Sequence, residues 1–388
     1  MKQTEIGLIP EDWEVKSLGE IGEPCMCKRI LKEQTSPTGD IPFYKIGTFG
    51  GIPDAYISRE LFEQYKEQYN YPKKGTLLLS AAGTIGRVVV FDGKDSYFQD
   101  SNIVWIDNDE TKVTNDFLFY CYSRMQWKTE EGGIVSRLYN ANLKSTSFIA
   151  PKSLAEQERI AKALSDVDAL ISTTEKLIQK KKNIKQGAMQ NLLTGKKRLP
   201  GFAKSTNYKQ SELGLIPEDW EVKSLGEMLK IGHGKDYKNL KSGNVPVYGT
   251  GGYMTSVNDF LYEGETVCIG RKGTIDKPQY HSGKIWTVDT LFYTYDFKSL
   301  NPKYLFYKFC LIDWLSMNEA SGVPSLTAKN IEDIQITIPT EEEQTAIANV
   351  LSSMDKEIET LNTKLEKYRN LKTAMMQQLL TGKIRLVK

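Results

Sequence analysis

Basic, hydroxyl and aromatic residues lie beside glycines at several places in the chain, and this combination suits the binding of phosphates or base edges. Arg87 ends the segment SAAGTIGR, and Arg271 and Lys272 lie in GRKGTIDK. Arginine can bind a phosphate, and it can also bind the O6 and N7 atoms of guanine with two hydrogen bonds. Glycines let the backbone approach a ligand closely. Gly-Thr segments are also common in ordinary hairpin turns, so each one alone is a weak signal.

Three such segments in the first half of the chain have counterparts in the second half. The pairs are 43–51 with 247–253, 80–87 with 270–277, and 136–144 with 324–332, called here loop 1, loop 2 and loop 3. Their polar side chains are the candidates for contacts to phosphates or base edges, as a DNA-binding site would need: Lys45, Thr48, Thr84, Arg87, Arg137, Tyr139, Asn140, Lys144, Tyr248, Thr250, Tyr253, Arg271, Lys272, Thr274, Ser325, Thr327 and Lys329.

The sequence gives no support for catalytic chemistry in this chain. Asn301-Pro302-Lys303-Tyr304 invites comparison with the N-P-P-Y motif of amino-methyltransferases, but its third residue is lysine. The aligned residues of the first half, 114–117, carry no such motif. Both segments instead predict a helix start, with a capping Thr or Asn before the first turn. No glycine-rich cofactor loop follows a predicted strand, so we expect no catalytic residue and no cofactor bound to this chain.

A structural metal site is not expected either. The five cysteines form no regular framework, and Cys25 and Cys27 are too close for the usual C-x2-C metal clip. The two histidines, His233 and His281, have no cluster of cysteines or carboxylates beside them. Structural zinc normally takes four such ligands.

Length and composition place the chain among globular proteins with two domains. It has 388 residues, of which 40% are hydrophobic and 26% charged. The N-terminus resembles no secretory signal and no apolar run is long enough for a membrane span, so we expect a cytoplasmic protein with reduced cysteines. Its net charge of +2 is low for a protein that binds DNA without a partner subunit. Its basic residues must therefore be concentrated, or a partner must supply further phosphate contacts.

One stretch of fourteen residues, GLIPEDWEVKSLGE, occurs twice without change, at 7–20 and at 214–227. The numbering offset between the copies falls from 207 here to 187 at the closing segments TGKKRL (194–199) and TGKIRL (381–386). The first copy therefore has 20 more residues (207 − 187), and we expect them around 58–75 as a surface-loop insertion. The near-identical ends indicate that each copy meets the same partner or the same internal surface, and recombination between the repeats is an alternative cause.

Two long helices are the clearest structural prediction. Apolar residues recur at spacings of three and four from Glu156 to Leu193, and again along the end of the second copy. Gly195 and Gly382 follow these segments, where a left-handed helix cap is common. At 1.5 Å per residue each helix is roughly 57 Å long. Each apolar stripe needs a partner, and an antiparallel pair supplies it for both.

The opening repeat predicts a shorter series of elements. Pro10, Glu11 and Asp12 suit a single helical turn, and the alternation from Trp13 to Val15 suits a strand. Ser17 and Glu20 fit the capping box of a short helix.

These elements predict an α+β fold with two globular α/β domains separated by a pair of long antiparallel coiled-coil helices, with pseudo-two-fold symmetry. The expected domains are residues 1–151 as the first globular domain, named target recognition domain 1 on the resemblance described next, and 152–197 as the first long helix. Residues 198–339 form the second recognition domain after a short linker, and 340–388 form the second long helix and tail.

Three sequence motifs occur in the same order in both copies. The opening motif I-P-x-x-W-x-x-x-x-L occurs at 9–18 and 216–225. The helix entry, a proline followed by E-Q-x-x-I, occurs at 151–160 and 339–347, and the exit L-L-T-G-K at 192–196 and 379–383. Each motif is weak alone, but the ordered set, present twice, is specific. Over essentially its full length the chain resembles the specificity subunit of type I restriction–modification enzymes.

The resemblance implies that each globular domain is a target recognition domain that reads one half of a bipartite site in double-stranded DNA, with loop 3 favoured as the reader. It implies that the helices set the gap between the half-sites and dock two modification subunits, which carry S-adenosylmethionine. Restriction subunits, which use ATP, would join them, while this chain would be non-catalytic. The alternative from another class is a coiled-coil adapter that does not bind DNA.

Overall fold

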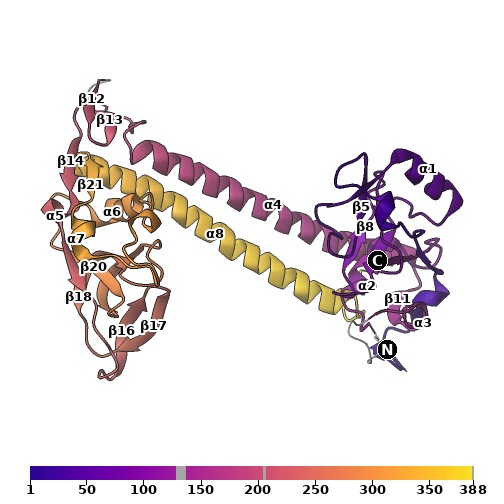
Figure 1. Cartoon of the computed structure of the whole chain (residues 1–388). Coiled ribbons are helices and arrows are strands. Elements are labelled where there is room, and N and C mark those ends of the chain that lie inside the picture. The colour runs from indigo at the N-terminus through magenta and orange to yellow at the C-terminus, as the bar shows by residue number, and fades with distance from the viewer. Residues whose placement is uncertain (128–136, 204–206, 387–388) are drawn as a thin grey trace. The chain divides into compact units, whose positions relative to one another are not determined.

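The computed structural model of the chain describes residues 1–127, 137–203 and 207–386 (Figure 1). The chain divides into two compact units, Met1–Thr173 with Leu365–Lys388 (unit 1) and Thr174–Lys364 (unit 2). Each unit therefore combines one globular domain with parts of both long helices, α4 (Leu154–Leu192) and α8 (Glu341–Leu379). None of the described helices is long and apolar enough to cross a membrane.

The described residues of unit 1 outside the long helices form short strands and three short helices. The strands are β1 (Lys2–Thr4), β2 (Gly7–Ile9), β3 (Trp13–Ser17), β4 (Pro24–Met26), β5 (Ile41–Tyr44), β6 (Tyr56–Ile57), β7 (Leu77–Ser80), β8 (Val88–Val90), β9 (Tyr97–Phe98), β10 (Ile103–Ile106) and β11 (Ser147–Pro151). The helices are α1 (Arg59–Gln68), α2 (Asn115–Tyr122) and α3 (Asn140–Ser145), with 3-10 turns η1 (Leu18–Glu20) and η2 (Lys32–Gln34). Its largest sheet has the order β4-β10-β7-β8, and β5 lies between β6 and β9.

Unit 2 repeats this plan with longer strands. They are β12 (Tyr208–Ser211), β13 (Gly214–Pro217), β14 (Glu221–Ser224), β15 (Lys230–His233), β16 (Ser242–Gly249), β17 (Gly252–Val257), β18 (Tyr262–Gly270), β19 (Gln279–Thr287), β20 (Leu291–Tyr295) and β21 (Gln335–Ile338). The helices are α5 (Leu225–Met228), α6 (Pro302–Phe309) and α7 (Ala328–Glu332), with the 3-10 turn η3 (Leu315–Met317). One sheet takes the order β15-β20-β18-β19-β16-β17.

The pairing of strands shows that the two globular domains have one topology. In unit 1 the opening strand β3 pairs antiparallel with β11, the strand that leads into α4. In unit 2 β14 pairs in the same way with β21, which leads into α8. A parallel pairing of β5 with β9 likewise corresponds to that of β16 with β19. The fold predicted from the repeat is confirmed at the level of each unit.

The helix starts that replace the supposed methyltransferase motif are also confirmed. The Thr114 hydroxyl accepts a hydrogen bond from the Phe117 N–H at the start of α2. Asn301 accepts hydrogen bonds from the N–H groups of Lys303 and Tyr304 at the start of α6, where Pro302 is the first helical residue. These caps satisfy backbone donors that an α-helix leaves unpaired.

The Glu-Gln pair at each helix entry ties these caps to the long helices. The Gln157 side chain accepts a hydrogen bond from the Thr114 N–H and donates to the carbonyls of Lys112 and Pro151. Gln344 makes the same three contacts in unit 2, with Asn301, Ser299 and Pro339. Both glutamines are buried, so each amide is fully used inside its unit.

Two local predictions were wrong. Residues 10–13 form a hydrogen-bonded turn, with the Trp13 N–H donating to the Pro10 carbonyl at 3.1 Å, because strand β3 begins at Trp13 and leaves no room for a helical turn. The extra segment of the first copy is not a plain surface loop. It contains α1, which is capped by Ser58 and anchored by the fully buried Phe62. The predicted pairing of Ser17 with Glu20 is present at η1.

The parts of α4 and α8 within each unit run antiparallel and exchange ion pairs. In unit 2 Lys181 pairs with Glu357 and Lys185 with Asp355, both at under 3 Å. In unit 1 Lys372 pairs with Asp168 at 2.6 Å. The predicted apolar stripe is only partly covered, since several of its members are substantially exposed: Leu170, Leu177, Ile184 and Leu371.

An arginine in each closing segment joins the end of one long helix to the opening repeat. In unit 1 the Arg385 guanidinium makes two hydrogen bonds to Glu156, at 2.6 and 2.8 Å, and two to Asp12, at 2.8 and 2.6 Å. It also lies over the ring of the buried Trp13. Hydrogen bonding to Arg385 lowers the pKa of Asp12 below its ordinary value. We call this set the unit 1 arginine clamp.

The unit 2 arginine clamp repeats this geometry with Arg198. It bonds Glu343 at 2.6 and 2.7 Å and Asp219 at 2.7 and 2.9 Å, and lies over Trp220. The glycine of each closing segment, Gly195 or Gly382, adopts the predicted left-handed conformation, with φ of +72° and +68°. A Cβ there would lie 2.5–2.6 Å from the opening proline, so only glycine fits.

Replacing Arg385 with Ala should destabilise unit 1 by about 3–5 kcal/mol, because Glu156 is only 1% exposed and would keep an uncompensated buried charge. Unfolding in urea, followed by tryptophan fluorescence, measures the loss. The matched control is Lys162→Ala, which breaks an exposed pair with Asp166 and should cost about 1 kcal/mol or less. Equal losses for the two variants would contradict a structural role for the clamp.

Candidate nucleic-acid interface

Loops 1 and 2 contact each other in unit 1 through an arginine. Arg87 follows β7 and donates a hydrogen bond from Nη1 to the Phe49 carbonyl of loop 1 at 2.8 Å. Loop 1 is itself a turn in which the Thr48 hydroxyl accepts a hydrogen bond from the Lys45 N–H, and Lys45 pairs with Asp54 at 2.8 Å. Arg87 thus holds two candidate reading loops together while part of its side chain stays exposed.

Loops 2 and 3 also meet in unit 1. The Leu138 N–H donates to the Ala81 carbonyl at 2.9 Å, and Arg137 forms a backbone bridge with Ala82. Leu138 is buried, so it anchors loop 3, while Arg137, Tyr139 and Asn140 around it are exposed. Ser136, the first residue of loop 3, lies outside the described residues.

Unit 2 joins its loops at equivalent places but with other side chains. The Leu326 N–H donates to the Arg271 carbonyl at 2.9 Å, and Lys272 forms a backbone bridge with Ser325. Gln279, which lies two residues after loop 2 at the start of β19, holds loop 1: its Nε2 donates to the carbonyls of Gly249 at 2.9 Å and Thr250 at 3.3 Å. In each unit, therefore, hydrogen bonds from loop 2, or from the strand that follows it, hold the three predicted loops next to one another.

Several predicted contact residues also have structural partners. Lys144 pairs with Glu23 at 2.8 Å, and Lys329 pairs with Asp333 at 2.6 Å. Thr327 caps α7 by accepting a hydrogen bond from the Asn330 N–H. Arg271 donates weakly to the Asp289 carbonyl. That these residues contact DNA stays a prediction. The contacts above show which of them also stabilise the folded structure.

The aromatic residues of loop 1 in unit 2 form a small cluster with a histidine. Tyr248 stacks on His281, with ring centroids 3.7 Å apart, and Tyr253 meets Tyr248 edge-on at 6.3 Å. Thr84 and Thr274 lie inside loop 2 of their units and Thr250 lies inside loop 1, all three outside helices and strands. Burial lowers the pKa of His281 to about 4, so its imidazole is neutral near pH 7.

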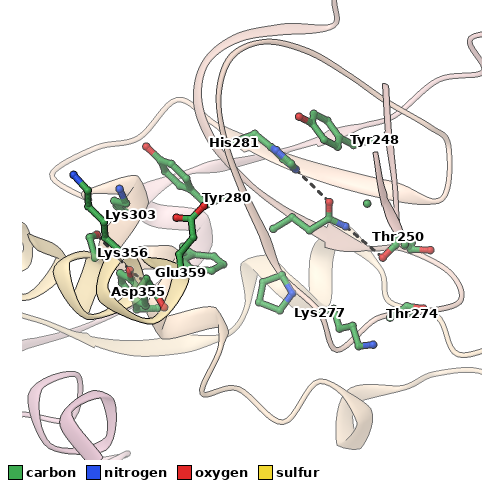
Figure 2. A pocket seen from close by; sticks show the side chains of 17 residues that line it. Tyr248, Thr250, Thr274, Lys277, Tyr280, His281, Lys303, Asp355, Lys356 and Glu359 are labelled. Atoms are coloured by element: carbon green, nitrogen blue, oxygen red, sulfur yellow. Dashed lines mark hydrogen bonds between the residues drawn. The ribbon is translucent and has the colours of Figure 1, made fainter. Parts of the chain in front are cut away.

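A cavity of about 850 Å³ opens beside this cluster, between loops 1 and 2, α6 and the part of α8 in unit 2 (Figure 2). Figure 2 shows His281 beside Tyr248 on one wall, and Lys303 with Lys356 on the helical wall. Gln279, His281, Lys303 and Lys356 were missed by the sequence reasoning, which considered His281 only as a metal ligand. The available signal was the alternation of Gln279 and His281, which places both side chains on one face of β19.

A family model described as the type I restriction modification DNA specificity domain matches residues 10–186 and again residues 217–367. The chain belongs to this family. Each matched region contains one set of loops 1, 2 and 3 together with the start of one long helix. The repeat detected in the sequence is thus a repeat of one DNA specificity domain.

Individual relatives agree with the family. A protein of Haemophilus influenzae named as a type I restriction enzyme specificity subunit is 58% identical over 165 residues, which are 42% of this chain and 43% of that protein. The MjaX specificity subunit of Methanocaldococcus jannaschii is 29% identical over 99% of this chain and 96% of its own length. The crystal structure of the type I restriction–modification S subunit of M. genitalium shares the fold, with a TM-score of 0.64 at 17% identity over 98% of both chains.

Replacing Thr327 with Ala should lower the stability of unit 2 by about 1 kcal/mol, because the N-cap of α7 is lost. Thr327→Ser keeps the hydroxyl and should restore most of that stability in urea unfolding. If Thr327→Ala leaves the stability unchanged, the hydroxyl does not function as a cap in solution.

Proposed function

We propose that this chain is the DNA sequence-specificity subunit of a type I restriction–modification complex, and that each unit reads one half of a bipartite site. The observation that carries the proposal is the joined surface of loops 1, 2 and 3. It is built on the same strands in both units, yet its side chains differ between them. A common frame with different polar side chains suits two readers of two different half-sites, because base edges carry the sequence information.

Partner subunits supply the chemistry in this proposal. Two modification subunits bind S-adenosylmethionine and methylate the site, restriction subunits use ATP, and this chain has no catalytic residue of its own. The low net charge of +2 supports a shared grip on DNA, since the partners then provide further phosphate contacts. The apolar residues left exposed on the long helices, such as Leu177 and Leu371, support docking of the modification subunits there.

The rival adapter function predicts no sequence readout. It offers no reason for the two loop surfaces to differ while the arginine clamps and the Glu-Gln pairs remain the same. We therefore favour the reading of DNA.

Replacing Arg137 with Ala should relax reading of one half-site, and Arg271→Ala should relax reading of the other. Each change should cost about 1–3 kcal/mol of discrimination if the arginine binds a guanine edge. Sequencing the methylated positions in host DNA shows which half-site has changed. Damage to the same half-site by both variants would refute the assignment of one half-site to each unit.

We also propose that the length of α4 and α8 sets the gap between the half-sites. Inserting seven residues after Ile178, and seven after Leu365, adds one heptad to each helix and keeps the apolar stripe in register. Each helix then lengthens by roughly 10 Å. In an active variant the methylated motif should keep both halves and gain about three base pairs between them, at 3.4 Å per step. An unchanged gap in an active variant would show that the helices do not set it.

A further inference from the structure

His281 lies in a setting that fixes which of its ring nitrogens carries the hydrogen. The Nε2 of Gln279 is 2.9 Å from the Gly249 carbonyl and 3.3 Å from the Thr250 carbonyl, so this atom must be the amide donor. The Oε1 of Gln279 is therefore an acceptor, and it lies 3.2 Å from Nε2 of His281. In the neutral imidazole, Nε2 then carries the hydrogen and Nδ1 carries the lone pair.

The ring is also fixed in position. Tyr248 covers one face of the imidazole at 3.7 Å with an angle of 26° between the rings. Tyr253, which is 64% exposed, extends this cluster toward the solvent, and His281 and Tyr248 both line the cavity of about 850 Å³. Since rotation of the ring would break both the stack and the bond to Gln279, Nδ1 is an acceptor held in one place.

The other walls of the cavity fit the surroundings of DNA. Lys277 follows loop 2, and Lys303 and Lys356 come from α6 and α8. Two acids lie on the helical wall. Asp355 pairs with Lys185 and accepts a hydrogen bond from Tyr307, so its charge is compensated, and Glu359 lies one turn further along α8. Lysines beside a polar reading group are the usual arrangement where a protein holds phosphates next to a base contact.

We propose that His281, held by Gln279 and Tyr248, accepts a hydrogen bond from the exocyclic amine of an adenine or cytosine in the half-site read by unit 2. In the major groove the only amine donors are N6 of adenine and N4 of cytosine, so an acceptor fixed beside loops 1 and 2 selects one of these bases at one position. This inference rests on the proposed function, and it names the chemical class of base that one residue recognises.

The test is a coupling measurement between a protein variant and a DNA analogue. Duplexes carry the methylated motif found in the host, and each adenine or cytosine of the second half-site is replaced in turn by purine or 2-pyrimidinone, which lack the amine. Binding of the complex of this chain with its modification subunits is measured for the wild type and for His281→Phe. Phenylalanine keeps the stack on Tyr248 and removes the acceptor.

At one position the analogue should weaken binding of the wild type by roughly tenfold, the size of one hydrogen bond, and should leave His281→Phe unaffected. His281→Gln, which retains an acceptor, should recover part of the discrimination. Analogues in the first half-site should weaken both proteins equally. If every analogue in the second half-site also weakens both equally, His281 only packs against Tyr248 and the inference is wrong. A wild-type complex that does not distinguish its motif from unrelated DNA would instead contradict the proposed function.

Discussion

The structure depends on the contact between an arginine of each closing segment and a carboxylate buried at the start of a long helix. Arg385 reaches Glu156 and Asp12 in unit 1, and Arg198 reaches Glu343 and Asp219 in unit 2. A carboxylate that is 1% exposed is stable only with such a partner. Each globular domain is therefore completed by a segment that comes from the end of the other repeat. The arginine clamp, the glycine turn and the buried tryptophan all join an opening segment to a closing segment. The residues at both ends of each repeat are therefore constrained to stay the same.

These contacts explain much of the fourteen-residue sequence that occurs twice in the chain. Ile9, Trp13 and Leu18 are buried in unit 1, as are Ile216, Trp220 and Leu225 in unit 2, so both copies must fit the same internal surface. Packing does not explain every repeated residue. Leu8 is 62% exposed and its counterpart Leu215 is 67% exposed. The internal surface accounts for the buried positions, and nothing in the structure explains the exposed leucines.

The variable part of each unit is built on the constant part without disturbing it. Loop 3 is fastened to loop 2 by backbone atoms in both units, which any side chain permits. Loop 1 is instead held by side chains, Arg87 in unit 1 and Gln279 in unit 2, so this contact changes with the reading surface.

The cores of the two units also differ from each other at one buried position. The buried Lys308 of α6 donates to the Leu193 carbonyl and to the Thr337 hydroxyl, where the aligned residue of unit 1 is Cys121. Burial lowers the pKa of Lys308 to about 7, so the amine can be neutral at physiological pH.

The sequence by itself determined the repeat, the two long helices and their glycine caps, because identity, spacing and turn chemistry are local and can be read along the chain. It also picked out the three segments named loops 1 to 3, since glycines and polar residues mark them, but it was wrong to treat all of them as loops. Loop 3 runs into a short helix in each unit, α3 or α7, and loop 1 of unit 2 is the turn between strands β16 and β17. Only the tertiary structure decided which groups meet. Gln157 accepts a hydrogen bond from the Thr114 N–H, Arg385 lies over Trp13, and His281 stacks on Tyr248. Each of these contacts joins residues tens or hundreds of positions apart. The same holds for His281 as a candidate reader, because its ring orientation is set by Gln279 and by a neighbouring loop. Such choices depend on burial and on long-range pairing, and no local pattern in the sequence records them.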